Sequence, residues 1–109
     1  MKYQFTVQEA RAQLNKDKQK VFTTLMEHGS MMVEFYVPKD VDLQTPHKQD
    51  ELYIITSGTA SFDRNGEKTI CRKSDILFVP AGMVHRFENF STDFAAWVIF
   101  YGPEGGEVS

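Results

Sequence analysis

Short apolar runs recur along this chain from Lys20 onward, and clusters of polar turn residues separate them. Runs of four to seven residues rich in Val, Ile, Phe, Tyr and Thr between such clusters are typical of β-strands. We expect eight strands, at 21–26, 31–37, 52–55, 59–62, 68–72, 76–78, 85–89 and 96–100. This number of short, regularly spaced strands predicts a small antiparallel barrel or jelly roll.

The N-terminal segment has a different pattern, with apolar residues at helical spacing. Thr6 to Glu9 has the form of a capping box, and Val7, Ala10 and Leu14 follow on one face. This predicts a short helix from about Val7 to Asn15. We therefore expect one domain over 1–109, with a helical segment at 1–19, a barrel at 20–101 and a tail at 102–109.

Two turn-forming stretches lead to further expectations. Asn65-Gly66 suits a two-residue hairpin, because both residues tolerate positive φ. The tail from Gly102 contains three glycines and a proline and has no packing pattern, which predicts a mobile or loosely docked end without chemistry.

Composition narrows the class of protein. The chain has 109 residues, of which 41% are hydrophobic and 25% charged, as in an ordinary globular domain. Its net charge of -3, without a basic cluster, argues against nucleic acid as a partner. A single cysteine, Cys71, and a start without an apolar run of signal-peptide length predict a cytoplasmic protein with no membrane partner.

Candidate chemistry centres on two of the three histidines, His47 and His85. Glu51 follows His47 by four residues, and a straight strand would separate the two by about 13 Å. Ligands of one metal bond at about 2.0 to 2.2 Å, so a shared metal requires a turn over the polar residues 48–50. His85 begins a predicted strand just after a Pro-Ala-Gly turn, near a barrel opening. Two imidazoles and a carboxylate match the facial triad of non-haem Fe(II) sites.

These spacings resemble the two motifs of the cupin superfamily, over a stretch from about Gln44 to Tyr101. The first motif has two histidines, a glutamate and a glycine, and is matched at His47, Glu51 and Gly58. The second is matched at Pro80, Gly82, His85 and Asn89. The resemblance implies an all-β fold, the cupin-type double-stranded β-helix, with a divalent metal held inside it by His47, Glu51 and His85.

The chain departs from these motifs at two positions. Thr45 stands where the first histidine is usual, and Ser74 replaces the opening glycine of the second motif. Threonine is a poor metal ligand, so one more coordination position is expected to be open, or filled by an amide oxygen of Gln44 or Gln49. The metal itself, whether Fe, Mn, Ni or Zn, is not specified by the motif.

Other side chains receive simpler interpretations. Strand alternation places Tyr53 on the same face as Glu51, and Phe87 and Asn89 on the same face as His85. Tyr53 and Phe87 are therefore candidate walls of a substrate pocket, together with Gln44 and Gln49. His28 is expected in an exposed turn, and Cys71 as a small buried hydrophobe.

Two functions are compatible with this site. The first is a metal-dependent enzyme, a dioxygenase or an isomerase, acting on a small organic molecule. No second carboxylate or lysine stands clearly beside the metal in the sequence, which favours redox or Lewis-acid chemistry over general acid and base catalysis. The alternative is a non-catalytic cupin that binds a metal or small ligand as a sensor, store or accessory protein. A structural domain without metal is a third option.

Association is expected as well. A small barrel has edges and apolar surface to cover, and Met31, Met32, Phe35 and the aromatic last strand are candidates for a subunit contact. This predicts a homodimer.

Overall fold

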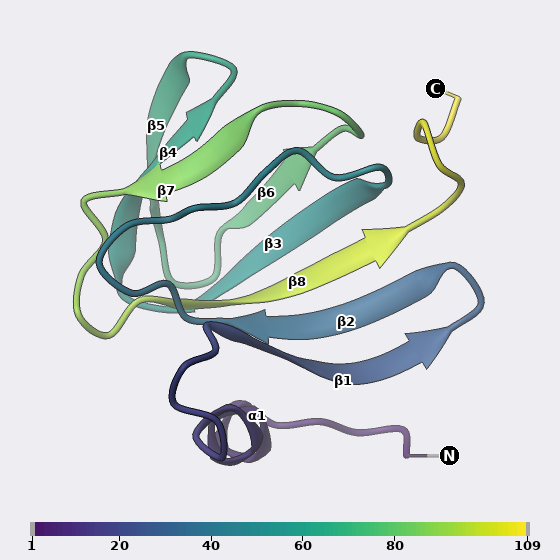
Figure 1. The fold of residues 1–109 in the computed structure, drawn as a ribbon. Coiled ribbons are helices and arrows are strands. Elements are labelled where there is room, and N and C mark those ends of the chain that lie inside the picture. Colours follow the sequence, from purple (N-terminus) through teal and green to yellow (C-terminus); the bar gives the residue numbers. More distant parts are fainter. Residues whose placement is uncertain (1, 109) are drawn as a thin grey trace.

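Two antiparallel sheets pack face to face in the computed structural model, which describes residues 2–108 (Figure 1). One sheet has the strand order β1-β2-β8-β3-β6 and the other β5-β4-β7. The strands are β1 Phe22–His28, β2 Met31–Tyr36, β3 Asp50–Ser57, β4 Thr59–Arg64, β5 Glu67–Arg72, β6 Ile76–Val79, β7 His85–Glu88 and β8 Ala95–Tyr101. The expected all-β jelly roll of eight strands is confirmed.

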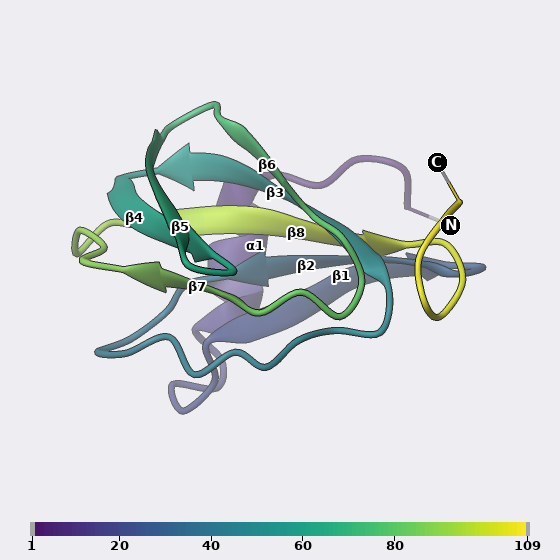
Figure 2. The ribbon, with the colours of Figure 1, turned by 90° about the horizontal axis from the view of Figure 1, so that it is seen from above.

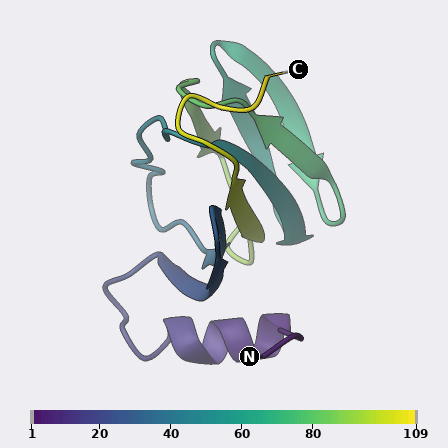
Figure 3. The same cartoon turned by 90° about the vertical axis from the view of Figure 1, so that its right-hand side faces the viewer.

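The one helix among the described residues, α1 (Val7–Leu14), lies against the outer face of the larger sheet, beside β1 and β2 (Figure 3). The Thr6 side chain accepts a hydrogen bond from the backbone N–H of Glu9, which confirms the expected cap. Ala10 and Leu14 are buried and form a small cluster with Phe35 and Ala95. Burial of these apolar side chains stabilises the packing of the helix against the sheet.

The position of Phe35 corrects one expectation. Its side chain is fully buried beneath α1 and makes an edge contact with Trp97, with ring centroids 5.2 Å apart. Phe35 therefore belongs to the core of the chain itself and is not available for a subunit contact. The reason is that the helix, whose docking site the sequence did not reveal, already covers that face of β2.

The Asn65-Gly66 hairpin is confirmed. Asn65 and Gly66 have φ values of 52° and 92°, and Arg64 pairs with Glu67 across the turn. By contrast, β7 ends at Glu88, one residue earlier than expected. Asn89 has a φ of 50° and is exposed, so the predicted alternation, which would turn its side chain inward, fails there.

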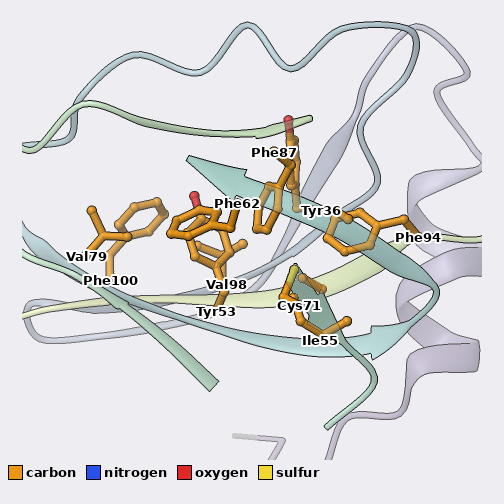
Figure 4. Close-up of a cluster of buried hydrophobic side chains, with 12 residues drawn as sticks. Tyr36, Tyr53, Ile55, Phe62, Cys71, Val79, Phe87, Phe94, Val98 and Phe100 are labelled. Carbon is orange, nitrogen blue, oxygen red and sulfur yellow. The ribbon is translucent and has the colours of Figure 1, made fainter. Parts of the chain in front are cut away.

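Aromatic side chains from both sheets fill the space between them (Figure 4). The rings of Phe62 and Phe87 lie 4.8 Å apart, and Tyr53 contacts both, at 5.9 and 5.0 Å between centroids. These separations are typical of offset and edge-to-face aromatic pairs. The packed rings therefore form the core between the two sheets.

The tail departs from the expectation of a loosely docked end. Figure 2 shows it looping back beyond the end of β8. The buried Asp50 carboxylate accepts hydrogen bonds from the backbone N–H groups of Glu107, at 2.8 Å, and Ala81, at 2.9 Å. The N–H of Gly105 donates to the Lys48 carbonyl. Every donor in these contacts is a backbone N–H, which any residue of the tail carries, so the residue types of the tail could not reveal them.

Within residues 2–108, no helix has the length and apolar character needed to cross a membrane.

Candidate metal centre

His47, Glu51 and His85 come together at one end of the barrel. Each offers one potential ligand atom, and these atoms lie within 4.8 Å of one another. His85 Nε2 is 2.9 Å and His47 Nδ1 is 3.9 Å from Oε1 of Glu51. Two atoms bonded to one ion at about 2.1 Å lie at most about 4.2 Å apart, so both measured pairs fit a common ion. The structure thus brings together the three residues that the motifs indicate.

Two turns produce this arrangement. The chain bends at Lys48 and Gln49 just before β3 begins, which brings His47 back beside Glu51 and confirms the expected turn. On the other side, the N–H of Gly82 donates to the His47 carbonyl at 2.7 Å. The turn of the second motif is therefore bonded directly to the histidine of the first.

The ring of His85 is oriented by its neighbours. Nδ1 lies 2.8 Å from the Met83 carbonyl, which only accepts, so Nδ1 carries the proton in the neutral ring. Nε2 then presents its lone pair to Glu51 and to the Tyr53 hydroxyl, 3.1 Å away. The Met83 carbonyl is the acceptor that a metal-binding imidazole needs for its remaining N–H.

The buried carboxylate of Asp42 positions Tyr53 indirectly, through the side chain of Gln44. Asp42 accepts hydrogen bonds from the Tyr36 hydroxyl (2.6 Å), the Phe87 N–H (2.8 Å), and both the backbone N–H (3.0 Å) and the amide nitrogen (2.9 Å) of Gln44. The amide oxygen of Gln44 therefore faces Tyr53, whose hydroxyl donates to it at 2.7 Å. Since that hydroxyl has one proton, its oxygen turns a lone pair toward His85.

Acceptors thus converge on the centre with no donor among them. Glu51 is 1% exposed, and within residues 2–108 neither of its carboxylate oxygens receives a hydrogen bond. Nε2 of His85 and the hydroxyl oxygen of Tyr53 each direct a lone pair into the same space. A buried carboxylate in this position is costly unless a cation balances it. The donor set fits a divalent metal, and the His47, Glu51 and His85 group could bind one.

The two histidines differ in basicity. Burial opposes protonation of His85, but the Glu51 carboxylate and the Met83 carbonyl outweigh it and raise the pKa of His85 above 6.5. Burial lowers the pKa of His47, and the more distant Glu51 offsets only part of that effect. Burial, with the charge of Glu51, raises the pKa of Tyr53, which keeps its phenol proton.

A cavity of about 460 Å³ adjoins His47. Its walls are mainly apolar, and come from Val21, Phe22, Tyr36, Val41, Val98 and Phe100. Gln44 and Thr45 line it as well, and its charged residues are Glu34 and Lys39. The volume is in the range of small-molecule sites.

The other predicted pocket residues are placed differently. The amide nitrogen of Gln49 donates to the carbonyls of Ser30 and Gly102, so it ties β8 to the β1–β2 hairpin. Tyr53 and Phe87 are fully buried in the core, and of the two only Tyr53 contacts a candidate ligand. His28 is exposed, as expected, although it is the last residue of β1 and precedes the turn. Cys71 is buried among apolar side chains, as expected.

Two relevant residues were missed from the sequence, Asp42 and Glu34. Glu34 could have been found, because strand alternation places it on the same face as Met32 and Tyr36. Asp42 lies in the irregular segment between β2 and β3, where no period indicates which side chains point inward.

Comparisons with known proteins agree with this description. The family model described as the cupin domain matches residues 32–101. An uncharacterized protein of Streptomyces coelicolor is 40% identical over 63 residues, which are 58% of this chain and 60% of that protein's length. The chain therefore spans less than two thirds of this curated relative.

Solved structures show the same fold. A cupin superfamily protein of Desulfitobacterium hafniense is 20% identical and has a TM-score of 0.63, covering 75% of this chain and 76% of its own. A crystal structure of DMSP lyases is 25% identical with a TM-score of 0.56, covering 68% of this chain and 38% of the other.

Proposed function

The chain belongs to the cupin family, and from this premise we propose that it holds one divalent metal ion on His47, Glu51 and His85 and catalyses a reaction of a small organic molecule in the adjoining cavity. The observation that carries the proposal is the Glu51 carboxylate, which is 1% exposed and has no hydrogen-bond donor on either oxygen among the described residues. A resident cation accounts for this carboxylate, and the two imidazoles beside it complete a ligand set.

Three protein ligands leave coordination positions for a substrate. Gln44 does not fill one, because its amide oxygen is bonded to Tyr53 and its nitrogen to Asp42. Thr45 is exposed on the cavity wall. The cavity therefore supplies the route by which a ligand oxygen reaches the centre.

Residues around the proposed metal centre orient its histidines and limit the access of water. Met83 orients His85, the ring of Phe100 packs on His47 at 4.7 Å between centroids, and the apolar cavity walls reduce the access of water. The metal, when bound, supplies Lewis-acid polarisation of a substrate oxygen or, if it is Fe or Mn, oxygen activation. Dioxygenase and isomerase chemistry both fit this arrangement. The similarity to part of a DMSP lyase structure supports a catalytic role, and fold alone does not identify the reaction.

Metal quantitation by mass spectrometry on untagged protein tests the proposal, with His47→Ala and His85→Ala as site variants. His28→Ala is the matched control, because His28 is exposed and does not belong to the group that could hold the metal. We expect about one equivalent of metal in the wild type and the control, lost in both site variants. Absence of metal after reconstitution with Fe(II), Mn(II), Ni(II) and Zn(II) would contradict the proposal.

The identity of the metal then directs the search for a substrate. Fe favours dioxygenase assays, whereas Zn or Ni favours isomerase assays. A protein that binds metal and small ligands but turns none over would support the sensor, storage or accessory role.

The homodimer stays a prediction. Light scattering at micromolar protein tests it, and a stable species of 12.5 kDa would contradict it.

A further inference from the structure

Glu34 places a carboxylate in the otherwise apolar wall of the cavity. Glu34 lies on β2, two residues after Met32 and two before Tyr36. The side chains of Met32 and Tyr36 both pack in or against the central core. Strand alternation therefore points Glu34 to the inner side of the sheet, and it lines the cavity there. A charged residue at an inward position of a strand is costly and suggests a role in binding.

The position of Glu34 relative to the metal centre follows from the strand register. Glu34 pairs with Val98, and Val98 pairs on its other side with Tyr53. Glu51 is two residues before Tyr53 on β3. Two strand spacings and two residues therefore separate the Cα atoms of Glu34 and Glu51, about 12 Å in a flat sheet. With both side chains pointing inward, a small molecule is long enough to span the gap between them.

Among the described residues, no cationic side chain of the cavity is paired with Glu34. Lys39 is the only cationic side chain among the cavity-lining residues of the described chain other than the titratable His47, and its ammonium group donates to the Lys18 carbonyl at the rim. Burial, the charge of Glu51 and that of Glu27 raise the pKa of Glu34, and Thr24 offsets this in part. A positively charged or hydrogen-bond-donating ligand group would relieve this unfavourable environment.

We propose that the cavity selects ligands with an apolar body, metal-binding oxygens at one end and an ammonium or other strong hydrogen-bond donor at the other, and that Glu34 receives this donor. The proposal rests on the proposed function, since the metal holds the oxygen end. It makes Glu34 the residue that sets specificity, and it predicts that ligands with a carboxylate at the same position are rejected.

Three catechols with a matched skeleton test this preference by isothermal titration calorimetry on Zn(II)-loaded protein without oxygen. Dopamine ends in an ammonium, 4-ethylcatechol in a methyl group, and 3-(3,4-dihydroxyphenyl)propionate in a carboxylate. We expect dopamine to bind about tenfold or more tightly than 4-ethylcatechol, and the carboxylate to bind weakest. Glu34→Gln should remove most of the dopamine preference, whereas Glu67→Gln, at an exposed glutamate of β5 outside the cavity lining, should retain it.

The outcomes separate this proposal from the one on which it rests. If the protein takes up no Zn(II), the proposed function fails and this inference fails with it. If Zn(II) binds but the wild type does not discriminate among the catechols, prefers the carboxylate or binds none of them, only the inference is overturned. A dopamine preference that survives in Glu34→Gln also overturns it. Circular dichroism on Glu34→Gln establishes that the variant is folded.

Discussion

Nε2 of His85 lies 2.9 Å from Oε1 of Glu51, and in the tautomer that Met83 imposes neither atom has a proton to share. Two acceptors at this distance repel each other unless a cation stands between or beside them, or His85 becomes protonated. The pair therefore behaves differently if the centre is a metal site than if it is a structural ion pair. Substitution of Glu51 distinguishes the two.

Glu51→Gln should abolish metal uptake and stabilise the metal-free protein at pH 8. The glutamine amide can donate to Nε2 of His85, and the buried charge is removed, so we expect a gain of about 1–2 kcal/mol in the free energy of unfolding. Urea denaturation measures this gain, and thermal denaturation with and without Zn(II) measures the lost metal stabilisation.

The control for this prediction is Glu27→Gln, since Glu27 is exposed and the change of charge is the same. It should alter neither quantity. A structural ion pair between Glu51 and His85 predicts the opposite sign, because removal of one partner from a buried pair costs about 3–5 kcal/mol. A loss of that size in Glu51→Gln would refute the interpretation as a metal site.

Metal affinity should rise with pH. Protons and metal compete for the histidine nitrogens. The pKa of His85 is raised above 6.5 and that of His47 is lowered below it, so on acidification His85 is protonated first and His47 second. Affinity should fall by up to about tenfold per pH unit while His85 alone competes, and more steeply once His47 also does. Competition with a chromophoric chelator for Zn(II) between pH 5.5 and 8 measures this, and a flat profile would disprove it.

Asp42→Asn should weaken both the fold and the metal site. Asp42 is 4% exposed and accepts four hydrogen bonds, whereas asparagine turns an NH₂ group toward some of the same donors. We expect a loss of about 2–4 kcal/mol in the free energy of unfolding. Release of Gln44 and Tyr53 should lower Zn(II) affinity by about 10- to 100-fold.

Two comparison variants make the Asp42 result specific. Tyr36→Phe removes one of the four hydrogen bonds, which should cost about 1–2 kcal/mol. Asp40→Asn changes an exposed residue whose φ of 58° asparagine tolerates, and should have little effect. If Asp42→Asn resembled Asp40→Asn in both stability and affinity, the hydrogen-bond network would not hold the centre.

The parts of this structure that could be predicted from sequence are those with local patterns. Asn65 and Gly66 specify their hairpin, because the turn demands positive φ at both positions. The candidate ligands followed from motif spacing, together with the requirement for a turn between His47 and Glu51. β3 was predicted too short, at 52–55 instead of Asp50–Ser57, because its first two residues are carboxylates, which a strand pattern does not anticipate.

The parts that were missed depend on contacts between distant segments. Asp50 holds the tail through the backbone of Glu107, 57 positions later in the chain. Phe87 and Asp42 are 45 positions apart, yet they are joined by a hydrogen bond. Each carboxylate is buried because backbone donors from elsewhere satisfy it, and single-sequence patterns contain no signal for such pairs.

Gly58 provides a stability test of the first motif that is independent of metal. Its φ is +77°, and a Cβ at this position would lie 2.7 and 2.8 Å from the backbone Cα and N of Phe94. Gly58→Ala should therefore cost about 3 kcal/mol or more in the free energy of unfolding, since backbone must shift in addition to the strain of positive φ. Gly66→Ala is the matched control: its φ is +92° with nothing within 4 Å, so strain alone should cost about 1 kcal/mol. Urea denaturation of both variants measures the difference. Equal losses would mean that this glycine is required only for its backbone conformation, and not for the close approach of the segment between β7 and β8.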